Sequence, residues 1–245
     1  MKNSVSFNSN LSRFGIGVFE TIKVTDRPLY LEYHLNRAFN SIFELDIITK
    51  VRKEDLRKYI LDYIKDNNIQ NKALRVTIFD EGYNLSTRDI IYDENSYRKG
   101  FDLTISPIKR GKSILNYHKT TNYFENIYSK NYASKNNFDD SIFIDYKGNI
   151  LECSFSNIFF IKDKTIVTPD KSLPILNGIT RKRVISFCIG KFDIIYENIN
   201  IEDIKRFDFC FITNSLMGCM RVNKIDDHVF ERKNEIFEII KENIN

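Results

Sequence analysis

The chain has 245 residues, which is long enough for one large domain or two smaller ones with sizeable cores. Its content of 42% hydrophobic and 29% charged residues is that of a folded protein and excludes a disordered one. The 37 basic residues exceed the 33 acidic ones by only four, which is too small a surplus to indicate nucleic-acid binding from charge.

Apolar runs and cysteines narrow the class of protein further. No stretch approaches the ~20 apolar residues of a membrane span, and the first residues carry no apolar run typical of a signal peptide. The four cysteines lack CxxC spacing and have no histidine at metal-ligand intervals. We therefore expect reduced thiols, buried at Cys188 and Cys210, no structural metal, no membrane association and a cytoplasmic location. The cysteines are Cys153, Cys188, Cys210 and Cys219.

The first half of the chain predicts a strand, two helices and further strands. Gly17–Val24 contains the β-branched residues Val18, Thr21 and Val24 and is expected to be a strand. Apolar residues at helical spacing predict helices over Leu31–Leu45 and Lys53–Asp66. His34, near the start of the first of these helices, is expected to be structural. Further strands are expected over Ala73–Phe79, Ser86–Tyr92 and Phe101–Pro107.

The second half begins after a polar segment, Arg110–Ser113, that breaks the pattern and predicts a linker near a domain boundary. A helix is expected over Phe124–Lys135, with Phe124, Ile127 and Tyr128 on its inner face. Helices are also expected from Ile179 to about Gly190 and over Glu231–Asn243. Strands are expected over Ser141–Asp145, Ile150–Glu152, Asn157–Ile161 and Thr165–Thr168. This mixture predicts an α+β protein with domains at residues 1–112 and 113–245.

Common catalytic motifs are missing from the chain, which contains no GxSxG, HExxH, GxxxxGK[ST] or GxGxxG sequence. Lysines alternate with aromatic residues from Lys119 to Asn137, a pattern also typical of grooves that bind single-stranded nucleic acid. An amphipathic helix explains this pattern better. A nucleic-acid-binding module is therefore kept only as a distant alternative, and no nucleic-acid partner is expected.

Several segments, taken in order, carry a resemblance to a known family. They resemble the fold-type IV pyridoxal-phosphate enzymes, the class IV aminotransferases, over the chain from about Phe14 to Val222. The resemblance implies the two-domain α+β fold of the D-amino-acid aminotransferase type, with a small N-terminal α/β domain and a larger C-terminal pseudo-barrel domain. It also implies pyridoxal 5′-phosphate as cofactor, and a homodimer. The segments are Phe14–Val24 with His34–Ser41, His118–Ala133, Gly148–Pro169, and Leu176–Val184 with Phe211–Val222.

The resemblance assigns three residues to the reactive part of the cofactor. Lys119, which opens the sequence KTTNY, matches the lysine that carries the cofactor as a Schiff base. Glu152 matches the carboxylate that pairs with the pyridine nitrogen and keeps it protonated, which the cofactor needs to accept electrons. Tyr123 matches a tyrosine found near the phenolate oxygen of the cofactor in some members.

A second set of residues matches the phosphate-binding groups of the family. Arg37 matches the arginine on the phosphate, and a guanidinium suits bidentate binding of that group. Ile179 and Thr180 follow Gly178 at a predicted helix start, where backbone N–H groups and the helix dipole favour an anion. Asn214 and Ser215 match a second phosphate-binding turn.

The choice between lyase and aminotransferase depends on finer features. Only Thr120 and Thr121 separate Lys119 from the Asn122–Tyr123 pair, whereas branched-chain aminotransferases carry one more residue there. The segment ITNSLMGCMRV resembles 4-amino-4-deoxychorismate lyases, whereas Glu20 stands where aminotransferases place glutamate and some lyases place threonine. These features favour the lyase, which makes 4-aminobenzoate for folate biosynthesis, over an aminotransferase of D-amino or branched-chain amino acids.

Three further residues are candidates for contact with the substrate. Phe19 stands where D-amino-acid aminotransferases have tyrosine. Arg88 lies in the segment STRDIIY, which resembles a pattern in lyases and makes this arginine a candidate clamp for a carboxylate. Arg221 follows the predicted phosphate-binding turn and is either a substrate contact or a surface residue.

Overall fold

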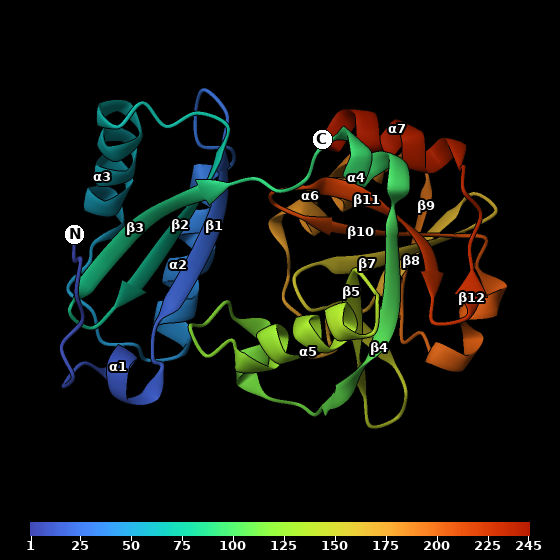
Figure 1. The fold of residues 1–245 in the computed structure, drawn as a ribbon, viewed down its shortest axis with the longest axis horizontal. Helices are drawn as coiled ribbons and strands as arrows, with labels where there is room; N and C mark the ends of the chain where they lie inside the picture. The colour runs from blue at the N-terminus through green and yellow to red at the C-terminus, as the bar shows by residue number, and fades with distance from the viewer. The chain divides into compact units, whose positions relative to one another are not determined.

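The computed structural model describes residues 1–245 and divides into two compact units, drawn in Figure 1. The first unit comprises residues 1–91 and 118–123, and the second comprises residues 92–117 and 124–245. The domain boundary expected at residue 112 therefore differs from the observed division, which falls at Ile91 and Tyr92.

The first unit is built on a three-stranded antiparallel sheet in the order β1-β2-β3. Helices α2 (Leu31–Glu44) and α3 (Lys53–Asp66) pack on one face of this sheet, and α1 (Asn10–Phe14) is a single short turn. Alternation places Leu74 and Val76 in this core, because successive side chains of a strand point to opposite faces. The strands are β1 (Val18–Val24), β2 (Lys72–Phe79) and β3 (Gly82–Asp89).

The segment His118–Tyr123 completes the first unit by pairing with the outer edge of β1. Lys119 O accepts a hydrogen bond from Phe19 N at 2.9 Å, and Thr121 N donates to Gly17 O at 2.9 Å. An edge strand offers unpaired backbone groups to any chain that reaches it, and this segment uses them. Lys119 therefore belongs to the first unit.

The second unit is a mixed nine-stranded sheet in the order β6-β5-β4-β11-β10-β7-β8-β9, with β12 paired to β11. The pairs β4–β5, β4–β11 and β8–β9 are parallel, and the remaining pairs are antiparallel. The strands are β4 (Phe101–Arg110), β5 (Asp140–Asp145), β6 (Ile150–Cys153), β7 (Asn157–Lys162), β8 (Thr165–Pro169), β9 (Asp193–Glu197), β10 (Phe209–Asn214), β11 (Gly218–Ile225) and β12 (His228–Val229).

This sheet curls until its two ends are joined by hydrogen bonds. Ile150 N on the outer edge of β6 donates to Ile199 O, just beyond β9, at 2.8 Å. Ile201 N donates to Gly148 O at 2.9 Å. Strands from both ends of the sheet share one apolar core inside the curl. The expected pseudo-barrel domain is confirmed.

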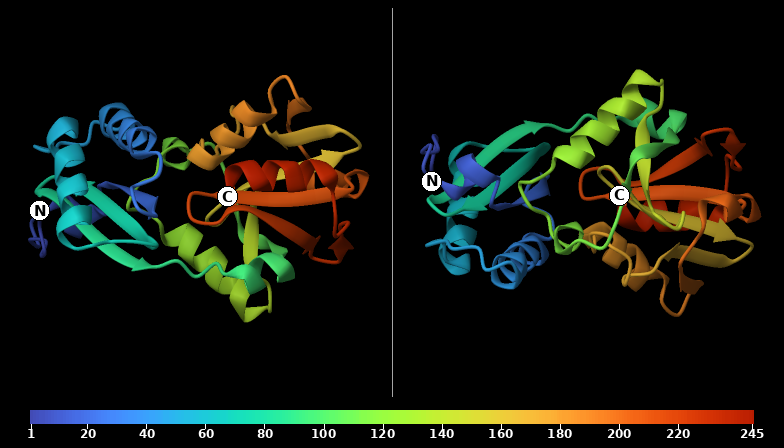
Figure 2. Two further views of the ribbon diagram at one scale, coloured as in Figure 1. Left: turned by 90° about the horizontal axis from the view of Figure 1, so that it is seen from above. Right: turned by 90° about the horizontal axis from the view of Figure 1, so that it is seen from below.

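Helices cover the second unit outside this core. Helices α6 (Ile179–Cys188) and α7 (Glu235–Ile244) pack on the outer face of the sheet, against Phe159 and Phe211, as Figure 2 shows for α7 along β10 and β11. Helix α5 (Phe124–Lys135) lies against β4 and β5. The remaining helices are α4 (Glu94–Lys99), η1 (Ile114–Tyr117) and η2 (Ile201–Arg206).

The expected inner face of α5 is wrong. Phe124 is 72% exposed, and Ile127 and Tyr128 are also exposed, while the helix buries Asn126 and Ser129. These polar side chains lie inside because each has a partner there. Asn126 Nδ2 donates to Ser154 O at 2.7 Å, and the Ser129 hydroxyl lies 2.8 Å from that of Ser106.

Two other expectations concern the whole chain. All four cysteines are buried free thiols, which confirms the burial predicted for Cys188 and Cys210 and extends it to Cys153 and Cys219. None of the helices combines the length and the apolar character that a membrane crossing requires.

Candidate active site

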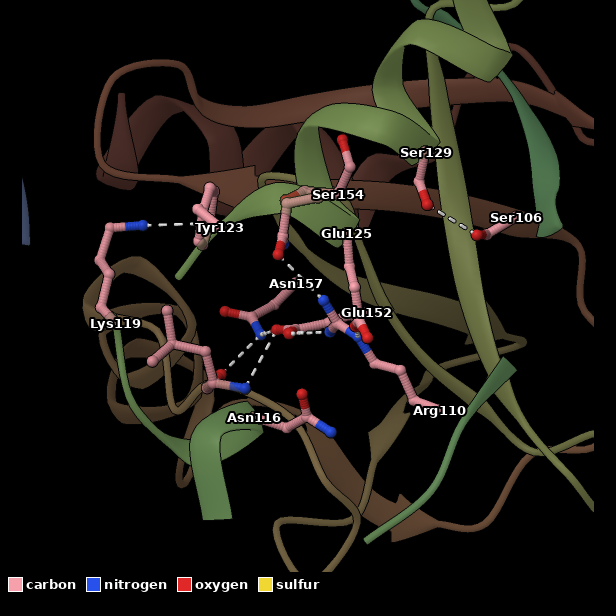
Figure 3. A network of polar contacts seen from close by, with 12 residues as sticks. Ser106, Arg110, Asn116, Lys119, Tyr123, Glu125, Ser129, Glu152, Ser154 and Asn157 are labelled. Atoms are coloured by element: carbon pink, nitrogen blue, oxygen red, sulfur yellow. Dashed lines mark hydrogen bonds and ion pairs between the residues drawn. The ribbon is translucent and has the colours of Figure 1, made fainter. Parts of the chain in front are cut away.

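In the first unit, Lys119 lies among two aromatic residues. Its Nζ atom is 3.5 Å from the hydroxyl of Tyr123 and 4.4 Å from the centroid of the Phe19 ring, and Figure 3 draws the bond to Tyr123. The two rings meet edge to face, with centroids 5.0 Å apart. The structure thus brings two other predicted site residues, Phe19 and Tyr123, close to the amine of Lys119.

Arg75 is a residue of this region that sequence reasoning missed. Its guanidinium carbon lies 3.7 Å from the centroid of the Phe19 ring, a cation–π contact. Burial lowers the pKa of Arg75, against the opposing effect of Tyr123. The sequence held one signal, because Arg75 interrupts an apolar strand between Leu74 and Val76.

The predicted carboxylate clamp Arg88 lies on β3 near Arg75. Arg88 is exposed and pairs with Ala73 of β2. Arg75 pairs with Ser86, which lies two residues before Arg88 on β3. The proximity of Arg88 contributes to the lowered pKa of Arg75. The two guanidinium groups form a cationic region on the sheet face opposite its helices. A role for Arg88 in substrate binding stays a prediction.

Arg37, the predicted phosphate ligand, is held by a buried carboxylate. Its Nε and Nη2 atoms donate to the two oxygens of Glu20 at 2.7 and 2.6 Å. His34 Nδ1 lies 2.6 Å from Glu20 Oε2. Burial alone would raise the pKa of Glu20, but Arg37 and His34 lower it to about 2. Burial lowers the pKa of His34, against the opposing effect of the Glu20 carboxylate.

In the second unit, Glu152 is buried and its carboxylate accepts several hydrogen bonds. Arg110 Nη1 donates to Oε1 at 3.0 Å, while Asn157 Nδ2 and Leu176 N donate to Oε2 at 3.3 and 3.1 Å (Figure 3). The Arg110 guanidinium also stacks 3.5 Å from the centroid of the Phe143 ring. The prediction that Arg110 lies in a linker is wrong, since it is the buried last residue of β4.

The N-terminus of α6 has the features of an anion site. Gly178 caps the helix without a side-chain hydrogen bond, and no acidic residue lies in the first turn. Ile179 and Thr180 are buried there. A Cβ atom on Gly178 would fall onto Oδ1 of Asn157, well inside van der Waals contact. The backbone is therefore open at this helix start only because the residue is glycine.

The second predicted turn follows β10. Asn214 Oδ1 accepts hydrogen bonds from Leu216 N and Met217 N, both at 2.9 Å, so this side chain shapes the turn that carries Ser215. Thr213 pairs with Asn157 across the β10–β7 ladder, which links the turn to the residue that packs on Gly178.

Unsatisfied hydroxyls support binding of a polar ligand in the second unit. The buried hydroxyl of Thr213 on β10 has no hydrogen-bond partner in the protein, and that of Ser156, directly before β7, has only the thiol of Cys153. Buried polar groups without partners are rare in native folds, and a ligand or ordered water commonly supplies the partner. Together with the open helix start, they fit a cofactor that carries a phosphate.

Arg221 is placed differently from a typical substrate contact. Its Nη2 atom donates to the carbonyls of Arg98 and Lys99 at 3.0 Å, and Nη1 donates to Arg232 O at 2.9 Å. Basic side chains stabilise the last carbonyls of a helix in this way, here those of α4. These bonds give Arg221 a structural role, and contact with a substrate stays a prediction.

A family model, "Amino-transferase class IV", matches residues 17–225. The chain belongs to this family. The family comprises pyridoxal-phosphate-dependent enzymes, so the chain is a pyridoxal-phosphate enzyme, an aminotransferase or a lyase.

Relatives within the class IV family carry more than one activity. A Rickettsia conorii protein assigned as a branched-chain-amino-acid aminotransferase is 30% identical over 226 residues, covering 85% of this chain and 77% of the relative. The aminodeoxychorismate lyase of Bacillus subtilis is 25% identical over 236 residues, covering 87% and 79%.

Solved structures that are similar to this chain also include both activities. A crystal structure of a Legionella pneumophila protein assigned as 4-amino-4-deoxychorismate lyase has a TM-score of 0.89 at 25% identity, covering 98% of this chain and 94% of that one. The branched-chain aminotransferase of Escherichia coli has a TM-score of 0.87 at 21% identity, covering 98% and 87%, and this likeness concerns the fold.

Proposed function

We propose that this chain is a lyase that converts 4-amino-4-deoxychorismate to 4-aminobenzoate and pyruvate, a step of folate biosynthesis. The observation that carries the proposal is the short Lys119–Tyr123 segment. Only two residues separate the lysine from the Asn122–Tyr123 pair, and the amine lies 3.5 Å from the phenol hydroxyl. The turn sequence NSLMG and the 94% coverage of the Legionella structure agree with this reading.

The residues that hold the cofactor in this proposal are those that the resemblance to the family assigns. Lys119 would be the catalytic amine, with Tyr123 near the phenolate oxygen and Arg37 on the phosphate. The Glu152 carboxylate would pair with the ring nitrogen. Ile179 and Thr180 at the start of α6 would bind the phosphate, together with Asn214 and Ser215 of the turn after β10. Backbone N–H groups at a helix start suit a phosphate dianion.

The chemistry requires an electron-accepting group beside a base. When bound, pyridoxal 5′-phosphate supplies a carbonyl that takes up the amine of the substrate and a ring that accepts an electron pair. Glu152, ionised beside Arg110, keeps a proton on the ring nitrogen. The Lys119 amine removes the proton from C4 of the substrate. The enolpyruvyl group then leaves, gains a proton and becomes pyruvate, while the remaining ring becomes aromatic.

An aminotransferase of branched-chain or D-amino acids is the second candidate. It is favoured by the Rickettsia relatives at 29% and 30% identity, which exceed the lyase of Bacillus subtilis at 25%. Glu20 also stands where the resemblance places glutamate in aminotransferases. In this reading Lys119 would return the proton to the cofactor, and a second keto acid would be required.

A single assay separates the two candidates. The purified protein, loaded with pyridoxal 5′-phosphate, is incubated with 4-amino-4-deoxychorismate alone, and pyruvate and 4-aminobenzoate are measured. The lyase releases both in equal amounts with no added keto acid. Product that appears only with an amino donor and a keto acid identifies the aminotransferase. The Lys119→Ala variant should lose turnover in either case, and borohydride should fix the cofactor to wild-type Lys119 but not to the variant.

The proposal also includes the assembly and location of the enzyme. We infer a homodimer from the resemblance to the class IV family, and a cytoplasmic location from the four reduced cysteines. Light scattering at micromolar concentration should then give twice the chain mass of 29.0 kDa. A mass of one chain would contradict the dimer without affecting the proposed chemistry.

A further inference from the structure

Asn157 is not among the assigned cofactor residues, but it contacts Glu152 and the start of α6, which are. It begins β7 and is buried. Its Nδ2 atom donates to Glu152 Oε2 at 3.3 Å and to Leu176 O at 2.8 Å. Its Oδ1 atom packs on the Cα of Gly178, at the place where any other residue would carry a Cβ. One amide therefore touches a carboxylate, a loop carbonyl and a helix cap.

Leu176 closes this arrangement from the other side. Its backbone N–H donates to Glu152 Oε2 at 3.1 Å, and its carbonyl accepts from Asn157. The Glu152–Asn157 pair thus holds both the N–H and the carbonyl of Leu176, which lies two positions before Gly178. Movement of the α6 start along its axis would break these bonds and expose buried polar groups, which is costly.

We propose that Asn157 is a positioning residue that couples the Glu152 carboxylate to the N-terminus of α6. This inference rests on the proposed function, in which Glu152 serves the ring nitrogen and α6 serves the phosphate. The distance between these two anchors of the cofactor is then set by one amide side chain. Loss of Asn157 therefore disturbs both ends of the cofactor at once.

The test measures each end separately with the apoprotein. Pyridoxal reports the ring end, inorganic phosphate reports the other end, and pyridoxal 5′-phosphate reports both. Binding is followed through the absorbance of the pyridoxal compounds, and phosphate is measured by competition. In Asn157→Ala we expect the dissociation constants of pyridoxal and of phosphate each to rise severalfold, and that of pyridoxal 5′-phosphate to rise about tenfold or more.

A matched control separates this effect from general damage. Asn200 lies in the same unit, where Nδ2 donates to Lys147 O at 3.0 Å and Oδ1 accepts from Glu202 N at 3.0 Å. Asn200→Ala therefore also removes two hydrogen bonds of an asparagine, away from Glu152 and α6. Its three dissociation constants should match those of the wild type.

A double-mutant cycle tests the contact itself. Gly178→Ala places a methyl group on Asn157 Oδ1, and the φ of −62° at Gly178 is one that alanine adopts without strain. This variant should weaken both pyridoxal and phosphate binding, because the amide must move. In the Asn157→Ala/Gly178→Ala double variant the methyl group has room. The double variant should therefore bind no more weakly than Asn157→Ala alone, instead of showing the product of the two losses.

Each possible result either supports or overturns the proposed coupling through Asn157. Unchanged binding in Asn157→Ala, a loss confined to one of the two probes, or multiplicative losses in the double variant would overturn the coupling. If Asn157→Ala does not fold, Gly178→Ala must show both losses, or the coupling is wrong. If the wild type binds no pyridoxal 5′-phosphate, the proposed function fails and the coupling with it. Normal binding by both wild type and Asn157→Ala defeats only the coupling.

Discussion

Glu20 and Glu152 are both buried carboxylates held by an arginine, but their remaining partners differ. Glu20 lies on β1 and faces two side chains of α2, Arg37 and His34, with which it forms a compact polar cluster. Glu152 is held by Arg110 and by amide groups. A buried charge is tolerated only when it is paired and hydrogen-bonded, so each carboxylate depends on its arginine.

The cluster around Glu20 predicts a pH dependence of stability. The pKa of Glu20 is about 2 in the folded protein against 4.5 for an ordinary glutamate, so folding favours the ionised form. This contribution is present above pH 4.5 and is lost as the pH falls toward 2. The shift corresponds to about 3 kcal/mol. The difference in unfolding free energy between wild type and Glu20→Gln should shrink by about that amount between pH 6 and 2.

Urea titrations followed by circular dichroism at several pH values measure this difference. Glu32→Gln serves as the control, because the Glu32 carboxylate is half exposed and its pairs with Arg57 and Lys53 lie at the surface. A difference between wild type and Glu20→Gln that does not vary with pH would contradict the assigned ionisation.

Removal of Arg110 should be more damaging than removal of its surface contact Glu125. Arg110→Met keeps much of the packing on Phe143 but leaves the buried Glu152 carboxylate without the cation that is hydrogen-bonded to it. Breaking a buried pair in this way costs about 3–5 kcal/mol. Glu125→Gln removes the outer partner of the same arginine, a half-exposed carboxylate at 3.3 Å, and should cost about 0–1 kcal/mol. Chemical denaturation of the two variants compares these costs, and equal losses would refute the distinction.

At the scale of elements, periodicity predicted most helices and strands of the core. The helices over Lys53–Asp66 and Phe124–Lys135 have the expected bounds. Helix α4 was not predicted, because its six residues are too short for a periodic pattern and its only signal is the capping box from Asp93 to Ser96. The burial of α5 was predicted wrongly, since its inner polar side chains find partners that are distant in sequence.

Helix α4 carries a contact that should stabilise the turn after β10. The hydroxyl of Tyr97 donates to Met217 O at 2.7 Å, and burial raises the pKa of Tyr97 to about 12. Tyr97→Phe should lower the free energy of unfolding by about 1 kcal/mol at pH 7. The contribution of the neutral phenol is complete below pH 10, the ordinary value, and is lost as the pH rises toward 12.

Denaturation of Tyr97→Phe at pH 8 and pH 11 checks both parts of this prediction. The difference from wild type should be smaller at the higher pH. Tyr146→Phe, at an exposed position, provides the control and should match wild type throughout. A Tyr97→Phe variant as stable as wild type at pH 8 would show that the bond contributes nothing.

At the scale of the whole molecule, the sequence predicted two parts and the pseudo-barrel, but not the division between them. The expected boundary followed the polar segment after residue 109, because linkers are usually polar. The structure instead continues β4 to Arg110, whose charge is buried with Glu152, and returns Lys119 to the first unit. Both differences arise from long-range pairings that leave no periodic signal. The residue roles came from the family resemblance, and Asn157 became visible only through its contacts.

The cofactor should stabilise the folded protein, because the residues proposed to hold it are brought together only by folding. Pyridoxal 5′-phosphate at 100 times its dissociation constant should raise the free energy of unfolding by about 2.7 kcal/mol. Thermal unfolding with and without the cofactor measures the change. An unfolding temperature that does not rise with the cofactor would contradict its binding to the folded protein. Lys119→Ala tests how much of the effect needs the covalent link.

The pairing of residues 118–123 with the edge of β1 has a consequence for synthesis on the ribosome. The polypeptide enters the second unit at Tyr92, returns to the first unit at His118 and leaves it again after Tyr123. The first 91 residues therefore emerge with one border of their sheet uncovered. That border stays open until translation has passed Tyr123, so Lys119 arrives as part of the segment that completes the nascent fold.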